Sequence, residues 1–355
     1  MNDSPLSDRR LRGGLDVRRH PTPGRERFTT TFEIRSDDED EPSVDLRRNN
    51  DGSWRVEVSA TTRGSGTIRP ASPEPVHVPR QELAAMMGGF DLRELGPSLP
   101  EDAKLPSSSS PKRLRKERDW SIRFGRLRYQ PTTIFNPDGR RPYYDTNYPW
   151  RCLVRITTPR GWAGSGVLIG PRHVLTASHC VDWTPGWFQV DVLYTNGSSL
   201  ATAYGTRAYY STKVGPGQIS DEDSDEDYAV IVLDQRLGDR YGWLGSRTYD
   251  GGWDDEQCWW RSIGYPQDFS STGQTAAYQR DFLLNELGWD YGSARLIRSD
   301  TFDNWPGQSG SPVFGFWSDG PHVVGVVSGQ GSDYNYISGG SLLPSLVKRA
   351  RDENP

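Results

Sequence analysis

The sequence predicts an all-β protein, an antiparallel sandwich or barrel, from about residue 134 onward. Short apolar segments rich in β-branched residues recur there, between clusters of Gly, Pro, Asn and Asp. This texture favours antiparallel strands over alternating β-α-β units. The first third of the chain is polar, charged and rich in Pro and Ser. A sizeable core is therefore expected only in the later part, although the whole chain averages 34% hydrophobic and 25% charged residues.

The N-terminal region predicts little regular structure. Residues 1–27 carry many Arg and Pro and few large apolar groups, a composition typical of disorder. Two alternating stretches, 29–34 and 54–58, predict a small hairpin, because the second follows an Asn-Asp-Gly turn signal. Residues 81–87 predict a short helix that ends at two glycines. The Ser-rich stretch 105–116 reads as a linker.

These signals divide the chain into a largely disordered N-terminal region, residues 1–131, and a folded domain, residues 132–355. Strands are expected at 152–156, 166–169, 188–192, 229–233 and 323–327. Near the end, Leu343, Leu346 and Val347 have helical spacing, which predicts a C-terminal helix.

The first candidate catalytic residue is His179, which follows an apolar strand and the small residues Ala177 and Ser178. Small neighbours allow an imidazole to stand at the wall of a cleft, where its neutral form accepts a hydroxyl proton near neutral pH. The alternative is an ordinary surface or core histidine.

The second candidate is Asp227, the last of a run of acidic residues between 221 and 227. It stands where the run enters the apolar stretch 229–233, and a partly buried carboxylate there can orient a histidine and stabilise its charged form. The other acids read as a solvated loop. Calcium binding is the alternative for them, but their spacing fits no recognised calcium loop.

The third candidate is Ser309, in a tight turn between Gly307 and Gly310 that precedes an apolar stretch. Glycine permits unusual dihedral angles and close substrate approach. The backbone N–H groups of Gly307 and Ser309 are candidates for an oxyanion hole. An ordinary Gly-Ser turn is the alternative. The order His, Asp, Ser along the chain is the order found in chymotrypsin and differs from other serine hydrolases.

Residues from about 134 to 350 resemble the trypsin-like serine proteases, and within them the bacterial glutamyl-endopeptidase branch. The resemblance lies in the motifs LTASHC, DYAVIVL and GQSGSP, and in residues 134–141 and 148–150, which are similar to the start of mature enzymes of that branch. It implies two six-stranded antiparallel β-barrels with a catalytic triad of His179, Asp227 and Ser309 at their junction. It also implies that residues 1–131 act as a propeptide or added region.

The implied activity is hydrolysis of protein or peptide substrates through an acyl-enzyme, without a metal ion or organic cofactor. Two rival hypotheses remain. The domain is a catalytically silent binding module that keeps a protease fold, since fold alone does not establish activity. Alternatively, the N-terminal region has the main role, as an adaptor or inhibitor.

The sequence departs from the family pattern before the nucleophile. Trypsin-type enzymes have an aspartate there, which pairs with a new amino terminus during activation, but this chain has Gln308. We therefore do not expect that salt-bridge switch.

Substrate preference is the second departure. Enzymes that cleave after glutamate carry a histidine where this chain has Val327. Asp303 has the spacing of the pocket-base aspartate of trypsin, which predicts Arg or Lys before the scissile bond, and Asp300 competes for this role. Ser328 and Gly329 are predicted to complete the substrate-binding site. A basic preference would make the basic linker, residues 112–128, a site of self-cleavage.

There are three cysteines, so at most one disulfide can form. In the resembled family the residue beside the catalytic histidine, here Cys180, is often bridged. Its usual partner position near residues 163–164 has no cysteine, and Cys152 is an alternative partner. Cys258, beside two tryptophans, is predicted to be a buried small hydrophobe.

Charge and hydropathy bear on whether the chain binds nucleic acids or membranes. The net charge of -5 gives no general reason to expect nucleic-acid binding. The basic run 112–128 reads as a solvated linker, with a nucleic-acid or anionic-surface site as the alternative. Residues 1–20 do not read as a secretory signal, and no apolar run is long enough to span a membrane. We expect a monomer that is cytoplasmic or exported by a non-classical route.

Overall fold

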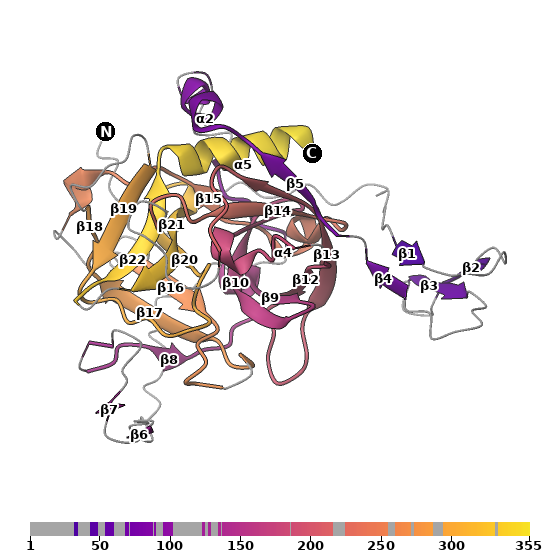
Figure 1. The fold of residues 1–355 in the computed structure, drawn as a ribbon, viewed down its shortest axis with the longest axis horizontal. Helices are drawn as coiled ribbons and strands as arrows, with labels where there is room; N and C mark the ends of the chain where they lie inside the picture. Colours follow the sequence, from indigo (N-terminus) through magenta and orange to yellow (C-terminus); the bar gives the residue numbers. More distant parts are fainter. Residues whose placement is uncertain are drawn as a thin grey trace. The chain divides into compact units, whose positions relative to one another are not determined.

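The computed structural model describes the following residues: 32–34, 43–48, 54–59, 68–70, 72–87, 89, 95–101, 123–124, 127–128, 134–135, 137–184, 186–215, 224–254, 260–270, 273–286, 294–330 and 333–355. The chain separates into two compact units. The smaller spans residues 29–71, and the larger holds all the rest (Figure 1).

The smaller unit consists of two antiparallel strand pairs. Strand β1 (Phe32–Ile34) pairs with β4 (Ile68–Pro70), and β2 (Ser43–Arg48) pairs with β3 (Trp54–Ser59). The predicted hairpin is therefore present at β3, but its partner is β2. The alternating stretch at β1 pairs with β4 instead, a strand that the pattern of apolar residues did not reveal.

The larger unit contains a closed six-stranded barrel. Its strands are β9 (Leu153–Thr158), β10 (Gly161–Gly170), β11 (His173–Thr176), β12 (Gln189–Val192), β13 (Ala201–Tyr210) and β14 (Ala229–Leu233). They pair in the order β12-β9-β10-β11-β14-β13, and pairing of β12 with β13 closes the ring. Every residue of β14 is buried, because one face fills the barrel and the other packs against the rest of the domain.

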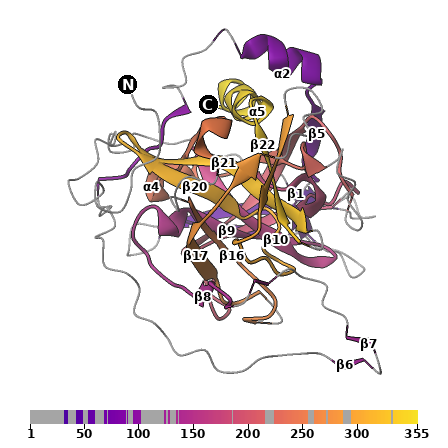
Figure 2. The same ribbon diagram turned by 90° about the vertical axis from the view of Figure 1, so that its left-hand side faces the viewer.

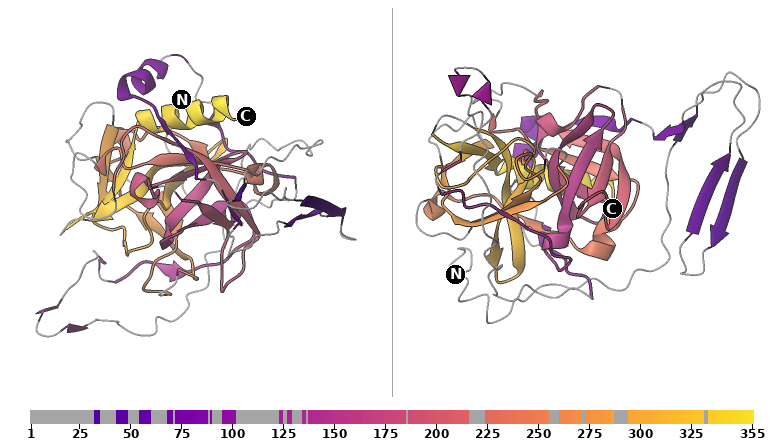
Figure 3. Two further views of the ribbon diagram at one scale, coloured as in Figure 1. Left: turned by 45° about the vertical axis from the view of Figure 1, so that its right-hand side comes forward. Right: turned by 90° about the horizontal axis from the view of Figure 1, so that it is seen from below.

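A second sheet curls beside this barrel, and Figure 3 shows the two from below. Its strands are β8 (Arg141–Pro142), β15 (Gly245–Ser246), β16 (Trp260–Gly264), β17 (Ala277–Phe282), β18 (Asn285–Glu286), β19 (Ala294–Ser299), β20 (Pro312–Trp317), β21 (Gly320–Gln330) and β22 (Asn335–Gly340). They pair in the order β18-β19-β22-β21-β20-β16-β17-β8, with β15 attached to β21. The all-β prediction is confirmed, but among the described residues this second barrel is an open half-barrel.

Short elements complete the described chain. They are the 3₁₀ helices η2 (Trp150–Cys152), η3 (Ser178–Cys180) and η4 (Gly251–Trp253), helix α4 (Leu237–Tyr241), and strands β6 (Arg123–Phe124) and β7 (Leu127–Arg128). No helix among the residues described above combines the length and apolarity needed to cross a bilayer.

The predicted C-terminal helix is present as α5 (Leu342–Glu353). It contacts strands of both sheets, and Leu343, Leu346 and Val347 are fully buried beneath it. Helix α2 (Arg80–Met86), which lies close to the predicted 81–87, packs beside α5 (Figure 2). Its Glu82 accepts an ion pair from Arg349 of α5 at 2.8 Å.

Residues 72–101 belong to the same compact unit as the barrels, although they lie within the predicted N-terminal region 1–131. Strand β5 (Glu74–His77) adds to β13 in parallel. Further along, Leu95 and Leu99 are fully buried, and the backbone of Ser98 pairs with that of Trp243. The division at 131/132 therefore needs this correction: a segment before it is built into the core of the folded domain.

Candidate active site

His179 lies on η3, directly after the buried strand β11. The strand end is fixed by the Thr176 hydroxyl, which donates to the Ser165 carbonyl at 2.7 Å. The Ser178 hydroxyl donates to the Thr212 carbonyl at 2.8 Å and fixes the turn itself. The side chain of His179 is 12% exposed, so the ring is mostly enclosed by the protein but is not sealed from solvent.

Asp227 is fully buried and contacts His179 directly. Its Oδ1 accepts the backbone N–H of His179 at 2.9 Å, and its Oδ2 lies 2.6 Å from the His179 Nδ1. The Ser328 hydroxyl donates to the same Oδ2 at 2.6 Å. With Nδ1 engaged by the carboxylate, the neutral ring presents Nε2 as its acceptor. Ser328, predicted to bind substrate, uses its hydroxyl to support Asp227.

The environment of His179 favours its protonated form. Burial lowers the pKa of the ring, but neighbouring Cys180 and the Asp227 carboxylate outweigh it and raise the pKa well above 6.5. The other buried histidine of the first barrel, His173, behaves oppositely. Its burial, and the positive charge of Arg351, lower its pKa to about 3, and its Nε2 lies 3.1 Å from the Ala350 carbonyl.

Ser309 lies in a turn that packs against β10 and against the end of β11, just before His179. Its carbonyl accepts the backbone N–H of Ser165 at 2.8 Å. Gly307 and Gly310 have φ values of +97° and +79°, which disfavour any other residue. A side chain at Gly310 would also come within 2.9 Å of the Ala177 backbone nitrogen, two residues before His179. The glycines therefore permit both the turn and its close approach.

The peptide groups around Ser309 have defined orientations. The carbonyls of Pro306 and Gln308 accept hydrogen bonds from other backbone N–H groups at 2.9 and 2.8 Å. In a trans peptide the N–H points opposite to the carbonyl, so those of Gly307 and Ser309 point away from these partners. Among the described residues, neither N–H has a protein acceptor. Two backbone donors thus flank the serine without being used by the fold.

A family model described as Trypsin matches residues 138–340. The chain belongs to the trypsin family. The resemblance to the trypsin-like serine proteases read from the three motifs is confirmed, and a glutamyl endopeptidase is among the relatives that follow.

Two bacterial relatives are similar to this trypsin-family chain. One is an extracellular metalloprotease of Bacillus subtilis (strain 168), 28% identical over 224 residues, which cover 58% of this chain and 65% of the relative. The other is a glutamyl endopeptidase of Bacillus licheniformis, 29% identical over 191 residues, covering 52% and 54%. This chain thus spans less than two thirds of either relative.

A solved structure of a Glu endopeptidase in complex with MPD has the same fold. It aligns with a TM-score of 0.50 and 22% identity, covering 62% of this chain and all of that one.

The carboxylate of Asp303 is already bonded to other groups of this chain. Its two oxygens accept the backbone N–H groups of Phe135 and Gly139, each at 2.6 Å, and the Gln279 amide donates to Oδ2 at 3.2 Å. Asp303 is 1% exposed, and burial raises its pKa to about 6 although these N–H groups lower it. Its carboxylate therefore anchors the segment around 134–140, a role that sequence spacing did not reveal.

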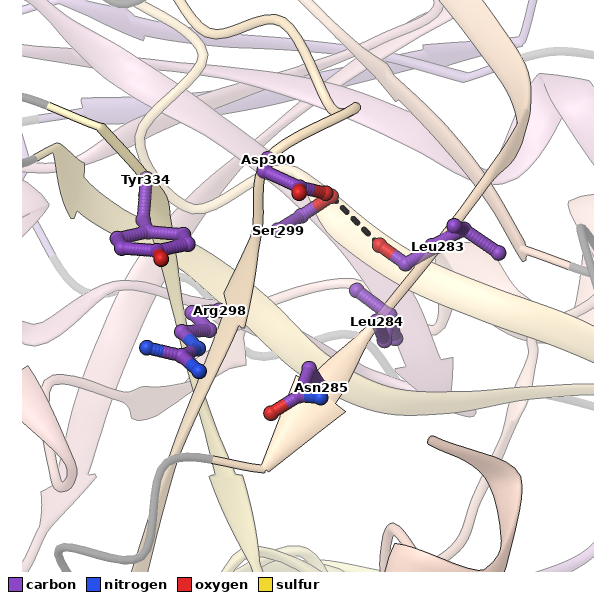
Figure 4. A pocket seen from close by; sticks show the side chains of 7 residues that line it. All are labelled: Leu283, Leu284, Asn285, Arg298, Ser299, Asp300 and Tyr334. Carbon is purple, nitrogen blue, oxygen red and sulfur yellow. Dashed lines mark hydrogen bonds between the residues drawn. The ribbon is translucent and has the colours of Figure 1, made fainter. Parts of the chain in front are cut away.

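Asp300, the alternative to Asp303, lines a polar pocket on the second sheet (Figure 4). The pocket is lined by Leu283, Leu284, Asn285, Arg298, Ser299, Asp300 and Tyr334. Ser299 closes one side by donating to the Leu283 carbonyl at 2.5 Å, and the Arg298 guanidinium lies 4.4 Å from the Tyr334 ring centre. No triad candidate lines this pocket. Gly329, predicted to bind substrate, has its carbonyl 3.4 Å from the Asn304 amide nitrogen.

Cys152 and Cys180 are both buried free thiols, so the structure contains no bridge between them. The Cys152 thiol donates to the Tyr241 carbonyl at 3.6 Å. A Cβ added at Gly164 would come within 2.6 Å of the Cys180 sulfur, which shows that the thiol points at the position where relatives have a partner. Cys258 lies outside the described residues.

The acidic run next to Asp227 is tied to the N-terminal segment. Arg80 of α2 pairs with the buried Glu226 carboxylate at 2.5 Å, and Thr212 donates to the same side chain. Residues 221–223 lie outside the described part. Among the described residues, no three His, Cys, Asp or Glu side chains form a group that could hold a metal ion.

Sequence reasoning missed Arg140 and Arg80 entirely. Arg80 pairs with Glu226, and Arg140 pairs with nearby Asp138 and also with the distant Asp268. No local pattern distinguishes these two arginines from exposed ones.

Proposed function

We propose that this chain is a serine endopeptidase in which Ser309 is the nucleophile, His179 the general base and Asp227 the group that orients the base. The observation that supports this best is the buried carboxylate bonded to Nδ1 of a partly exposed imidazole. That contact leaves Nε2 to take the proton of the serine hydroxyl as its oxygen attacks a peptide carbonyl.

The rest of the reaction follows from the turn around Ser309. The unused N–H groups of Gly307 and Ser309 are suited to bind the oxyanion of the tetrahedral intermediate. The imidazolium then protonates the leaving amine, an acyl-enzyme forms, and water releases it through the same base. The substrates are proteins or peptides, and the proposed chemistry requires no metal or cofactor.

A labelled fluorophosphonate tests this proposal directly. The folded chain is expected to be modified at Ser309, with loss of the label in Ser309→Ala and after heat denaturation. A catalytically silent binding module would remain unlabelled while keeping its fold. That outcome, with wild-type protein shown to be folded by circular dichroism, would reject the enzyme hypothesis.

The raised pKa of His179 predicts how activity depends on pH. Only the neutral imidazole accepts the serine proton, so kcat/KM should rise with pH along a limb that lies above 6.5. Asp227→Asn removes the charge that stabilises the imidazolium, so the limb should move to lower pH. The same variant should lose on the order of 10⁴ in kcat, because the tautomer is no longer held.

The measurement is kcat/KM for a peptide substrate between pH 5 and 10, with assays at each pH checked for enzyme stability. Ser328→Ala is the matched control, since it removes a neutral donor to Asp227 and keeps the carboxylate. An acid limb at the same pH in wild type and Asp227→Asn would contradict the assignment.

The contacts of Asp303 do not favour the predicted Arg or Lys preference. Both oxygens are used by backbone N–H groups, and the side chain is 1% exposed. We therefore propose that Asp303 does not set the preference. One relative is named a glutamyl endopeptidase, but the histidine expected for that preference is Val327 here.

A peptide library cleaved by wild type and Asp303→Asn separates these hypotheses. We expect the order of preferred residues before the scissile bond to be the same for both, although the variant is less active because segment 134–140 is loosened. A strong wild-type preference for Arg or Lys that disappears in Asp303→Asn would instead restore Asp303 as the base of the pocket.

A further inference from the structure

Arg140 is a buried cation that contacts the Ser309 turn. Its side chain is 1% exposed, and its guanidinium lies between the carboxylates of Asp138 and Asp268. Nε and Nη2 donate to Asp138 at 3.2 Å each. The Asp268 carboxylate accepts hydrogen bonds from both Nη1 and Nη2. The Phe269 ring covers the group, with its centre 5.2 Å from the guanidinium carbon. The planar donor fork of arginine is thus fixed on all sides.

One donor of this fork reaches Gln308, the residue immediately before Ser309. Arg140 Nη1 donates to the Gln308 Oε1 at 2.8 Å in a fully buried contact. The same oxygen accepts the backbone N–H of Trp305 at 3.0 Å. Because two donors converge on it, this atom must be the amide oxygen. Gln308 is 1% exposed and therefore has no solvent to replace these bonds.

Gln308 stands between the two N–H groups proposed for the oxyanion hole. Its backbone N–H donates to the Trp305 carbonyl at 3.0 Å, so its side chain and main chain together close the turn of residues 305–309. A side chain that closes a turn fixes the directions of the peptide groups inside it. The orientation of the N–H groups of Gly307 and Ser309 therefore depends on Gln308, and that of Gln308 on Arg140.

Arg140 is held in place by the same segment that Asp303 anchors. The N–H groups of Phe135 and Gly139 donate to Asp303, which lies six residues before Ser309. A Cβ at Gly139 would come within 2.9 Å of the Gln279 amide nitrogen, so the absence of a side chain there favours the close approach. Phe135 and Gly139 thus attach this segment at two points to the loop that leads into the Ser309 turn.

We propose that Arg140 is a positioning residue that holds Gln308, and through it the N–H groups of Gly307 and Ser309, ready for an oxyanion. A cation from within the chain then stabilises the turn, and the uncut chain is competent for acylation without a free amino terminus near residue 134. The inference rests on the serine-endopeptidase function proposed above, and its test is designed so that the two can fail separately.

The first experiment uses the full chain with an N-terminal tag and a labelled fluorophosphonate, followed by mass spectrometry of the intact protein. We expect the label at Ser309 on molecules of uncut mass. Labelling only after cleavage within residues 102–133 would overturn the inference and leave the proposed function standing. Absence of labelling in both the cut and the uncut protein would count against the function itself.

The second experiment measures kcat and KM for Arg140→Gln, with Asp268→Asn as the matched control. Loss of oxyanion-hole geometry should lower kcat by about 10²–10³ and leave KM within a few-fold. Asp268→Asn weakens one side of the Arg140 cluster but keeps the contacts of Arg140 with Asp138 and Gln308, so its loss of kcat should be much smaller than that of Arg140→Gln. Arg140→Lys keeps the charge without the planar fork and should lie between wild type and Arg140→Gln. Arg140→Lys replaces Arg140→Gln in this measurement if Arg140→Gln does not fold.

Two further readouts distinguish positioning from simple stability. A peptide boronic acid, which places an oxygen in the oxyanion hole, should bind Arg140→Gln much more weakly, whereas the cleaved product peptide should bind as in wild type. Gln308→Glu should remain active, because a carboxylate accepts from the same two donors. Equal kcat in Arg140→Gln and wild type, or equal losses in Arg140→Gln and Asp268→Asn that follow thermal stability, would overturn the proposal.

Discussion

Ser309→Ala is expected to lower kcat by on the order of 10⁴ or more, which is the largest effect of any single substitution proposed for this chain. The proposed nucleophile is removed, and only binding and the proposed backbone donors at Gly307 and Ser309 remain to assist attack by water. The free energy of unfolding should change little. The turn is held by its backbone and by Gln308, and no hydrogen bond of the Ser309 hydroxyl is found among the described residues.

The matched control is Ser311→Ala, two residues further along the same turn. Its hydroxyl is buried and has no hydrogen-bond partner among the described residues, so its loss should leave both activity and stability near wild type. Activity is followed with a peptide substrate, and stability by thermal unfolding. If Ser309→Ala kept a tenth of the wild-type kcat, or if both variants lost activity together, Ser309 would not be the nucleophile.

Removal of residues 1–131 is expected to unfold the trypsin-family domain, whereas removal of residues 1–71 should be tolerated. Val78, Leu83, Leu95 and Leu99 are each at most 2% exposed within the larger unit. Burial of four such side chains contributes about 6–12 kcal/mol, at roughly 1.5–3 kcal/mol each. A whole domain is stable by only about 5–15 kcal/mol, so this loss is of the same size.

Two polar consequences act in the same direction. Loss of β5 leaves β13 with an unpaired edge outside the closed barrel. Loss of Arg80 leaves the buried Glu226 carboxylate without its ion pair, immediately before Asp227. Both changes occur at the side of the barrel that carries the candidate triad, so activity should fall even in any folded fraction.

Soluble yield and urea unfolding of residues 72–355 and 132–355 test this prediction. We expect wild-type stability for the first protein and little folded material for the second. A folded 132–355 protein with wild-type stability would show instead that residues 72–101 are a removable leader. Higher activity of that protein than of the full chain would further identify them as an inhibitor.

The sequence predicted best those elements that a pattern of neighbouring residues specifies. Strand β14 and helix α5 follow from apolar residues at fixed spacing, since burial selects that spacing wherever the element docks. His179 and Asp227 were found in the same way, at the ends of apolar strands, and the structure brings them to 2.6 Å. Gly307 and Gly310 were recognisable because a tight turn demands residues that tolerate positive φ.

Asp303 shows where this reasoning stops. Its position six residues before Ser309 predicted a charge that faces the substrate. In the structure, its carboxylate oxygens instead accept hydrogen bonds from the backbone N–H groups of residues 135 and 139. Spacing along the chain predicts where the backbone of a residue lies relative to a motif. It does not predict which distant backbone group bonds to the end of its side chain.

By itself the sequence determined the fold class, the family and the residue types available for catalysis, because these depend on periodicity and on short motifs. Tertiary structure alone decided which charges are already paired: Arg140 with Gln308 and Asp268, Arg80 with Glu226, and Asp303 with backbone N–H groups. The physical reason is that a buried polar group must find a partner, and the partner is chosen by the packing of segments that lie more than a hundred residues apart.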